Sequence, residues 1–417
     1  MMSEKLEWHA VTLEEIAEIT GGGTPKREVH AYWNGNIPWA TPTDITNNNK
    51  KVIEKTAEYI TEEGLKNSSA KLLPVGTVLM TSRATIGYCA INTVPMATNQ
   101  GFANFICKNN VYNLFLLYLL TFHKDNFEKL GSGSTFKEVA KSTLKSYRVE
   151  IPPLPEQRKI AAILSSVDEA IEKTEAIIEQ TEKVKKGLMQ QLLTKGIGHT
   201  RFKKTEIGEI PEEWEVKSIS EVAKVVSGGT PSKQVYEYWE NGTIPWATPT
   251  DITSNDNKYI STTQLMITES GLRNSSANLL PEGSVLMTSR ATIGSRCINT
   301  VPMATNQGFK SFICDPDVLH NEYLYYLIDK IKDQFIALAS GSTFLEISKS
   351  AVETFKIPVP PLEEQIEIAK MLSSLDEKLS VEKVKKESLQ TIKKGLMQSL
   401  LTGKVRVKVD EDEVVSS

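Results

Sequence analysis

Two short segments that occur twice in this sequence carry arginines of the kind that can read nucleic-acid bases. Arg83 lies in one copy of TSRATIG and Arg290 in the other, each after a run of apolar residues typical of a strand. A guanidinium can donate two hydrogen bonds to guanine in the major groove. Base reading is therefore one interpretation. The other is a salt bridge from Arg83 to Asp44 and from Arg290 to Asp251.

Amide side chains occur in a second repeated segment, TNQGF. Asn99 and Gln100 precede a Gly-Phe turn, and Asn306 and Gln307 do so in the second copy. Asn and Gln can pair with adenine through two hydrogen bonds. Base contact is thus possible, but we favour a buried amide network that holds the turn.

Hydroxyl groups and exposed cations form a third set of candidates for contact with DNA. The hydroxyls lie in STF segments before a helical stretch: Ser134, Thr135, Ser342 and Thr343. They are suited to gripping a phosphate, and a helix cap explains them equally well. The cations follow the two GGTP turns: Lys26, Arg27 and Lys233. For these cations, contact with phosphate and plain exposure to solvent are equally good interpretations.

Other residue types give little support to a catalytic or metal site. The four cysteines form no CxxC pair and have no histidines at metal-ligand spacing, so we interpret them as buried free thiols. Four tryptophans could be mistaken for base-stacking platforms, but packing is favoured for them: Trp33, Trp39, Trp239 and Trp246. The segment Glu215 to Lys217 (EVK) matches part of a nuclease signature, but the first copy has no lysine there.

These segments belong to a tandem duplication, in which the second half repeats the first at an offset of 206 to 208 residues. The matched pairs are GGTP (22–25 and 228–231), IPWATPTDIT (37–46 and 244–253), LMTSRATIG (79–87 and 286–294), TVPMATNQGF (93–102 and 300–309) and SGSTF (132–136 and 340–344). This period exceeds the roughly 20–50 residues of a solenoid unit. Each copy is therefore a whole domain with its connector.

Each copy has a mixed part and a helical part. Short β-branched runs between Gly, Pro and Asn turns, with an apolar helical stretch at 112–122, indicate an α+β fold. The helical parts begin at IPPLPEQ and VPPLEEQ. We place the two domains at 1–151 and 197–358, the helices at 152–196 and 359–405, and a disordered tail at 406–417.

The helical parts show a heptad pattern. Apolar residues recur in steps of three and four from Ile160 to Leu192, broken at Lys185, and the second seam is interrupted at Glu382, Lys386 and Lys393. Neither helix can bury so long a stripe alone, so we expect two long antiparallel coiled-coil helices joining two similar globular domains with pseudo-twofold internal duplication. The seam does not fix the orientation, and a parallel homodimer of helices stays open.

Length, charge and hydropathy set further bounds. The chain has 417 residues, 40% of them hydrophobic, and a net charge of −4. Residues 1–150 carry a net charge of +1 and residues 201–357 a net charge of −4. Neither segment is a basic domain, so any DNA contact needs clustered lysines or a partner that supplies phosphate contacts. No signal peptide or membrane span is recognisable, and we expect a cytoplasmic protein without membrane contact.

The sequence resembles the specificity subunits of Type I restriction-modification systems. The resemblance rests on the duplicated domains, GGTP, IPW with TDI, IPPLPEQ, and the helix ends KKGLMQQLLTKG (185–196) and KKGLMQSLLTGKV (393–405). It covers nearly the whole chain, and the combination is specific although each motif alone is weak.

The resemblance implies a non-catalytic subunit that binds a bipartite target in double-stranded DNA, one half-site per domain. It implies two modification subunits, which methylate adenine with S-adenosylmethionine, and restriction subunits, which use ATP and Mg²⁺. The chain itself would hold no cofactor and no metal. We expect exposed residues near the helix ends to dock the modification subunits: Leu188, Met189, Leu396 and Met397. Because the two copies share their candidate loops, we also expect similar, inverted half-sites.

Two other classes of function compete with this interpretation. One is a DNA-modifying enzyme or nuclease with a fused reader, and the other is an architectural coiled-coil protein with ligand-binding domains. The sequence contains no methyltransferase NPPY motif, no GxxxxGK[ST] loop and no HExxH, so we favour the non-catalytic reader.

Overall fold

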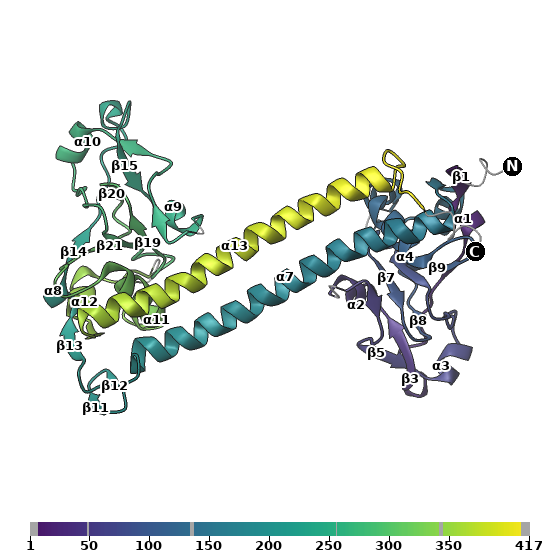
Figure 1. The fold of residues 1–417 in the computed structure, drawn as a ribbon, viewed down its shortest axis with the longest axis horizontal. Helices are drawn as coiled ribbons and strands as arrows, with labels where there is room; N and C mark the ends of the chain where they lie inside the picture. Colours follow the sequence, from purple (N-terminus) through teal and green to yellow (C-terminus); the bar gives the residue numbers. More distant parts are fainter. Residues whose placement is uncertain (1–6, 48–49, 134–136, 256, 342–344, 410–417) are drawn as a thin grey trace. The chain divides into compact units, whose positions relative to one another are not determined.

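The computed structural model describes residues 7–47, 50–133, 137–255, 257–341 and 345–409. Its contacts divide the chain into two compact units (Figure 1). Unit 1 is Met1–Glu175 with Val384–Ser417, and unit 2 is Ala176–Lys383. Each unit therefore holds one mixed domain and a part of each long helix.

The domain of unit 1 is built on a mixed five-stranded sheet with the order β2-β9-β6-β7-β4. Its strands are β2 (Ala17–Gly21), β9 (Phe102–Cys107), β6 (Val78–Thr81), β7 (Cys89–Asn92) and β4 (Val52–Ile53). Helix α4 (Asn113–Phe122) packs on β6 and β7, and residues of the sheet, α4 and the start of the first long helix form one buried core. The apolar run at 112–122 is thus the helix that the sequence predicted.

A smaller three-stranded sheet, in the order β5-β3-β8, completes this domain. The strands are β3 (Trp33–Ala40), β5 (Glu58–Ile60) and β8 (Ala97–Thr98). Short helices α2 (Pro42–Thr46) and α3 (Glu62–Lys66) follow β3 and β5 in the chain. Pro42 at the start of α2 supplies the φ that the first turn of a helix needs.

Unit 2 repeats both sheets position by position, with orders β14-β21-β18-β19-β16 and β17-β15-β20. The strands are β14 (Ala223–Ser227), β21 (Lys310–Cys314), β18 (Val285–Met287), β19 (Arg296–Asn299), β16 (Tyr259–Ile260), β17 (Met266–Ile267), β15 (Ile244–Ala247) and β20 (Ala304–Thr305). Helix α11 (Asn321–Ala337) takes the place of α4. The sequence repeat is therefore a repeat of fold.

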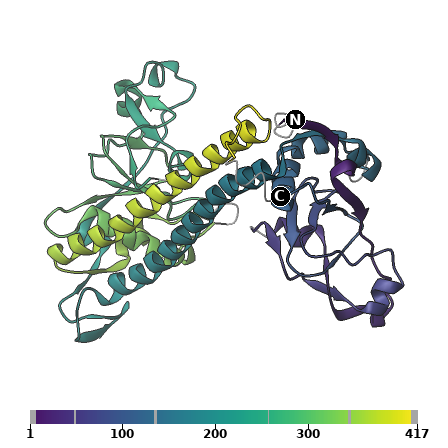
Figure 2. The ribbon, with the colours of Figure 1, turned by 45° about the vertical axis from the view of Figure 1, so that its right-hand side comes forward.

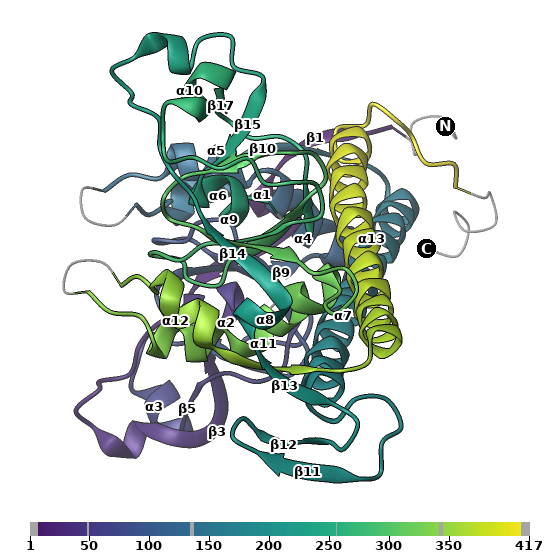
Figure 3. The same ribbon diagram turned by 90° about the vertical axis from the view of Figure 1, so that its left-hand side faces the viewer.

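In each domain, a pair of antiparallel strands lies at the junction with the long helix that follows the domain. These pairs are β1 (His9–Thr12) with β10 (Arg148–Ile151), and β13 (Glu215–Ser218) with β22 (Lys356–Val359). Unit 2 also carries the hairpin of β11 (Phe202–Thr205) and β12 (Gly208–Pro211), which Figure 3 shows beside β13. The remaining helices are α1 (Leu13–Ile16), α5 (Lys124–Leu130), α6 (Lys141–Ser146), α8 (Ile219–Val222), α9 (Pro249–Thr253), α10 (Glu269–Arg273) and α12 (Lys349–Thr354).

The two long helices are α7 (Leu154–Lys195) and α13 (Leu362–Leu400), and they pair in each unit (Figure 2). In unit 1, Lys393 contacts Asp168 at 2.7 Å and Lys386 contacts Glu175 at 2.9 Å. Residue numbers fall along α13 as they rise along α7, so the helices are antiparallel, as expected.

Unit 2 shows the same pairing, through Lys185 with Asp376 and Lys383 with Glu182. The lysines that interrupt the predicted seams at 185, 386 and 393 are therefore the cations of interhelical ion pairs.

The segment after α13 is bound to the start of α7 in unit 1, although we expected disorder from residue 406. Arg406 binds the carboxylate of Glu156, and the backbone N–H of Val407 donates to the same group at 3.1 Å. Glu156 is only 2% exposed, so the contact satisfies a buried charge. The rest of the expected tail, 410–417, lies outside the described residues.

Candidate nucleic-acid interface

The two candidate arginines lie in tight turns of the same construction, which we call the arginine turns (residues 82–85 and 289–292). Ala84 has a φ of 63° and Ala291 a φ of 59°. The backbone N–H of Thr85 donates to the carbonyl of Arg83 at 2.8 Å, and Thr292 does the same to Arg290 at 2.7 Å. A positive φ at a residue with a side chain costs free energy, and such strain clusters at functional sites.

Each arginine turn is held against a second segment that supplies a glutamate. Arg83 forms an isolated bridge with Glu138, and its Nε lies 3.8 Å from a Glu138 oxygen. Arg290 forms the equivalent bridge with Glu346, to which its Nη2 donates at 2.6 Å.

The alternative that we gave for these arginines, a salt bridge to Asp44 and Asp251, names the wrong acids. Asp44 accepts hydrogen bonds from the backbone N–H groups of Thr41 and Ala57, both at 2.8 Å. Asp251 does the same for Thr248 and Gln264. Each carboxylate caps a helix with one oxygen and holds a loop with the other, so both of its oxygens already accept hydrogen bonds.

Of these two glutamates, Glu346 has the more strongly charged surroundings. Burial favours the neutral carboxyl group, but the hydrogen bond from Arg290 and the charge of Lys310 outweigh burial and lower the pKa of Glu346. The carboxylate is therefore ionised at neutral pH and accepts from both cations.

The amides form a turn beside each arginine turn. Asn99 Oδ1 accepts from the backbone N–H of Gly101 at 2.8 Å, and the carbonyl of Gly101 accepts from Ser82 at 2.8 Å. Gln100 accepts from the hydroxyl of Thr24 in the GGTP turn. Unit 2 repeats these contacts with Asn306 and Gln307, the latter bonded to Thr230.

Asn99 and Asn306 thus hold the turn, while Gln100 and Gln307 are exposed rather than buried in a network. The carboxamide nitrogens of the two glutamines remain candidates for base contact.

Glycine is required where the GGTP turns meet these amide turns. A Cβ on Gly22 would lie 2.1 Å from the carbonyl oxygen of Asn99, and one on Gly228 would lie 1.8 Å from that of Asn306. Such distances are far below van der Waals contact, so both copies need glycine at this position. The GGTP, TNQGF and TSRATIG segments are thereby joined into one surface in each domain.

The hydroxyls of the STF segments, Ser134, Thr135, Ser342 and Thr343, lie outside the described residues. The flanks of each segment are described. Ser132 and Glu138 pair as antiparallel neighbours, and so do Ser340 and Glu346. Each STF segment therefore connects two chain segments that border an arginine turn. The helix cap in this region is Ser348, which accepts from Ala351 at the start of α12.

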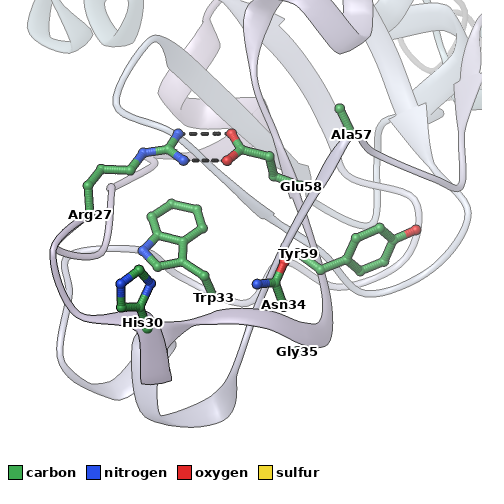
Figure 4. Close-up of a pocket in the computed structure, with 8 residues that line it drawn as sticks. All are labelled: Arg27, His30, Trp33, Asn34, Gly35, Ala57, Glu58 and Tyr59. Carbon is green, nitrogen blue, oxygen red and sulfur yellow. Dashed lines mark hydrogen bonds and ion pairs between the residues drawn. The ribbon is translucent and has the colours of Figure 1, made fainter.

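The cations after the GGTP turns differ between the units. Arg27 donates to Glu58 through Nη1 and Nη2, and its guanidinium stacks 4.0 Å from the ring centre of Trp33 (Figure 4). The pair borders a shallow cavity also lined by His30, Asn34 and Tyr59. Arg27 is thus an ordered residue and not a freely solvated one, whereas Lys26 and Lys233 are exposed.

The tryptophans pack as predicted. Trp39 and Trp246 are buried, and each indole N–H donates to a glycine carbonyl of the GGTP turn, at 2.8 and 2.9 Å. Trp33 and Trp239 meet them edge to face, with ring centres 5.1 and 5.0 Å apart. These rings support the small sheet and are not open stacking platforms.

Of the four residues that we expected to dock a partner, Met189 is buried, and the other three are half-buried: Leu188, Leu396 and Met397. Met189 is 8% exposed and belongs to the core of unit 2, against which Leu188 also packs. Leu396 and Met397 pack against the core of unit 1. The helix ends therefore use these side chains to hold their own domains. The apolar side chains that α7 and α13 do expose are Ile177, Val184, Ile366, Met371, Val381, Val384 and Ile392.

Within the described ranges, no group of three or more His, Cys, Asp or Glu side chains could hold a metal ion. The cysteines are unpaired, and burial raises the pKa of the thiols of Cys89, Cys107 and Cys314 to about 12. No helix among the described residues is long and apolar enough to span a membrane.

Comparison with known proteins identifies the family. The model of the Type I restriction modification DNA specificity domain matches residues 5–183 and 211–391. The MjaIX specificity subunit of Methanocaldococcus jannaschii is 30% identical over 415 residues, which cover 96% of this chain and 94% of that one. The EcoR124I/EcoR124II specificity subunit of Escherichia coli is 33% identical over 175 residues, covering 40% and 41%.

Solved structures share the fold. An S subunit of a Type I system from M. genitalium superimposes with a TM-score of 0.59 and 16% identity, over 96% of this chain and 98% of that one. A chain from a study of complex assembly in the type I R-M system gives 0.60 and 19%, over 96% and 100%. The chain therefore belongs to the family of Type I restriction-modification specificity subunits, and its role is recognition of the DNA target.

Proposed function

We propose that each unit reads one half of a bipartite DNA target, and that the chain thereby directs partner enzymes to that target. The observation that carries the proposal is the recurrence, in two separate units, of one surface made from the arginine turn, the amide turn and the GGTP turn. A repeated reading surface needs a repeated target. Antiparallel helices that pass through both units would then set the separation of the half-sites.

The two half-sites are expected to be similar and inverted. Arg83 and Arg290, Asn99 and Asn306, and Gln100 and Gln307 occupy equivalent places in the two units. Equivalent side chains on equivalent backbones favour the same bases. The target would be nearly palindromic around an unspecified spacer.

The chain is proposed to have no catalytic activity of its own. The best candidate for a nuclease motif is EVK, which lies on a strand that pairs with β22. Its lysine, Lys217, forms an ion pair at 2.8 Å with Glu215 of the same motif, so the ammonium group is already engaged. Modification subunits with S-adenosylmethionine, and restriction subunits with ATP and Mg²⁺, would supply the chemistry. The Type I resemblance supports this division.

A partner is also expected to supply much of the contact with the DNA backbone, because the chain carries a net charge of −4. Its docking surface would include exposed apolar residues of the long helices, such as Val184 and Val381 in unit 2 and Val384 and Ile392 in unit 1. Exposed apolar side chains on a charged helix are typical of contact surfaces. Val381→Glu and Val384→Glu should each weaken co-purification with a modification subunit.

The test is a map of methylated adenines. Cells or reconstituted complexes with the modification subunit are compared with and without this chain. We expect methylation in a bipartite motif with similar inverted halves only when the chain is present. Methylation in an unbroken motif, or turnover by the isolated chain, would contradict the proposal.

A further inference from the structure

Unit 2 contains a buried lysine at a position where unit 1 has an alanine. Lys310 begins β21 and is 6% exposed. Alignment of the two GF segments places Ala103 at the equivalent position in β9. Because lysine is rarely buried without a partner, this difference between two otherwise similar strands requires a specific role.

The partner of Lys310 is the glutamate that holds the arginine turn. Lys310 Nζ lies 3.3 Å from Glu346 Oε1 and 3.4 Å from Ser289 Oγ. The other oxygen, Glu346 Oε2, accepts from Nε and Nη2 of Arg290 at 3.0 and 2.6 Å. A carboxylate thus lies between a buried ammonium and a partly exposed guanidinium, and the three groups together carry a formal charge of +1.

The contact with Glu346 leaves one edge of the guanidinium available. Among the described residues, Arg290 makes hydrogen bonds through Nε and Nη2 only, on one side of the fork. A guanidinium has five N–H donors in a fixed plane. Nη1 and the second hydrogen of Nη2 form the other edge, whose two N–H groups match O6 and N7 of guanine.

The backbone of Arg290 is fixed as well. The strained turn at Ala291 follows it, and the carbonyl of Ser289 before it accepts from the backbone N–H of Ile347 at 3.0 Å. Fixing the backbone and the side chain before DNA arrives reduces the entropy lost on binding.

Resting on the proposed function, we propose that Arg290 reads a guanine in the second half-site, and that Glu346 and Lys310 are positioning residues that hold its guanidinium for that contact. Unit 1 presents Arg83 beside Glu138 with Ala103 in place of the lysine. The two units would therefore share the base but differ in how strongly they discriminate against other bases.

The experiment uses the complex of this chain with its modification subunit. DNA duplexes carry the target mapped for the wild-type complex, with each base pair of the second half-site replaced in turn. Arg290→Gln should relax discrimination at one guanine by about tenfold or more. Lys310→Met, which keeps the length of the side chain without its charge, should relax discrimination at the same base pair, and Lys310→Arg should restore it.

Two results would overturn the proposal. A uniform loss of methylation across all duplexes would identify a phosphate contact, and unchanged discrimination would identify a purely structural ion pair. Ala103→Lys is the matched variant in unit 1 and should leave discrimination in the second half-site unchanged. If Lys310→Met does not fold, Glu346→Gln tests the same contact. Failure of the proposed function would show in the wild-type complex, as methylation without a bipartite motif.

Discussion

Asp168 of α7 and Lys393 of α13 lie 2.7 Å apart in unit 1, and the same carboxylate accepts a hydrogen bond from Tyr118 of α4 at 2.6 Å. One buried side chain therefore joins both long helices to the domain. Unit 2 has the equivalent pair of Asp376 with Lys185. Because these contacts pair a particular residue of one helix with a particular residue of the other, they fix the register of the antiparallel pair as well as its direction.

Asp168→Asn should destabilise unit 1 by roughly 3–5 kcal/mol, since it leaves the partly buried ammonium groups of Lys51 and Lys393 without their charged partner. Burial favours the neutral form of Asp168, but hydrogen bonds from Lys393, Lys51 and Tyr118 outweigh burial and lower its pKa. The stabilisation is therefore present above the unfolded pKa, about 3.9, and is lost as the pH falls through the lower folded value. Thermal unfolding between pH 3 and pH 7 measures both effects.

The control for Asp168→Asn is Glu179→Gln, which removes an exposed ion pair with Lys183 on the same helix. An exposed pair contributes little, so this variant should unfold like the wild type. Equal stability of the two variants, at every pH, would show that the Asp168 contacts do not hold the helices.

Truncation after Lys404 should destabilise unit 1, because it removes Arg406 and leaves the buried carboxylate of Glu156 without its cation. An uncompensated buried charge costs roughly 3–5 kcal/mol. Truncation after Val409 keeps the contact and is the matched control. Denaturant unfolding compares the two, and equal midpoints would contradict the role that we assign to Arg406.

Two glycines allow a paired test of the reading surface. Gly228→Ala should destabilise unit 2 and weaken DNA binding, because its Cβ would collide with the backbone of Asn306. Gly187, near the C-terminal end of α7, has open space around it, so Gly187→Ala should stabilise the chain by up to about 1 kcal/mol. Thermal unfolding of both variants checks this, and a harmless Gly228→Ala would mean that the turn can move aside.

The sequence predicted the duplication, the mixed domains and the paired helices, because these depend on patterns within each segment. It could not assign the interruptions of the seam: Lys185 and Lys393 find their aspartates on a helix about two hundred residues away in the chain. It also assigned the wrong acids to Arg83 and Arg290, because Glu138 and Glu346 reach them through pairing of chain segments that no local pattern reveals.

Exposure was harder to predict than secondary structure. Met189 lies on a helix rich in charged residues, yet it faces the core of its own domain. Which side of a helix is covered by a domain from another part of the chain is a property of tertiary packing and not of periodicity. Lys310 is the reverse case, a charged residue that the fold buries beside Glu346.

The most direct test of the account is to lengthen both helices by one heptad. Seven residues are inserted after Glu175 in α7 and after Lys383 in α13, where the two units meet in sequence. The insertion adds about 10.5 Å of helix, at most roughly three base pairs of DNA at 3.4 Å each, and keeps the apolar seam in phase. A seven-residue insertion in the turn of the β11–β12 hairpin is the control and should change nothing.

Methylated adenines are then mapped for the complexes with wild-type, lengthened and control chains. The account predicts that the lengthened chain directs methylation to the same two half-sites. Because the insertion adds about 10.5 Å of helix, about one to three more base pairs should separate the half-sites. An unchanged spacer, or altered half-sites, would contradict the claim that two repeated units read the DNA at a separation set by the helix pair.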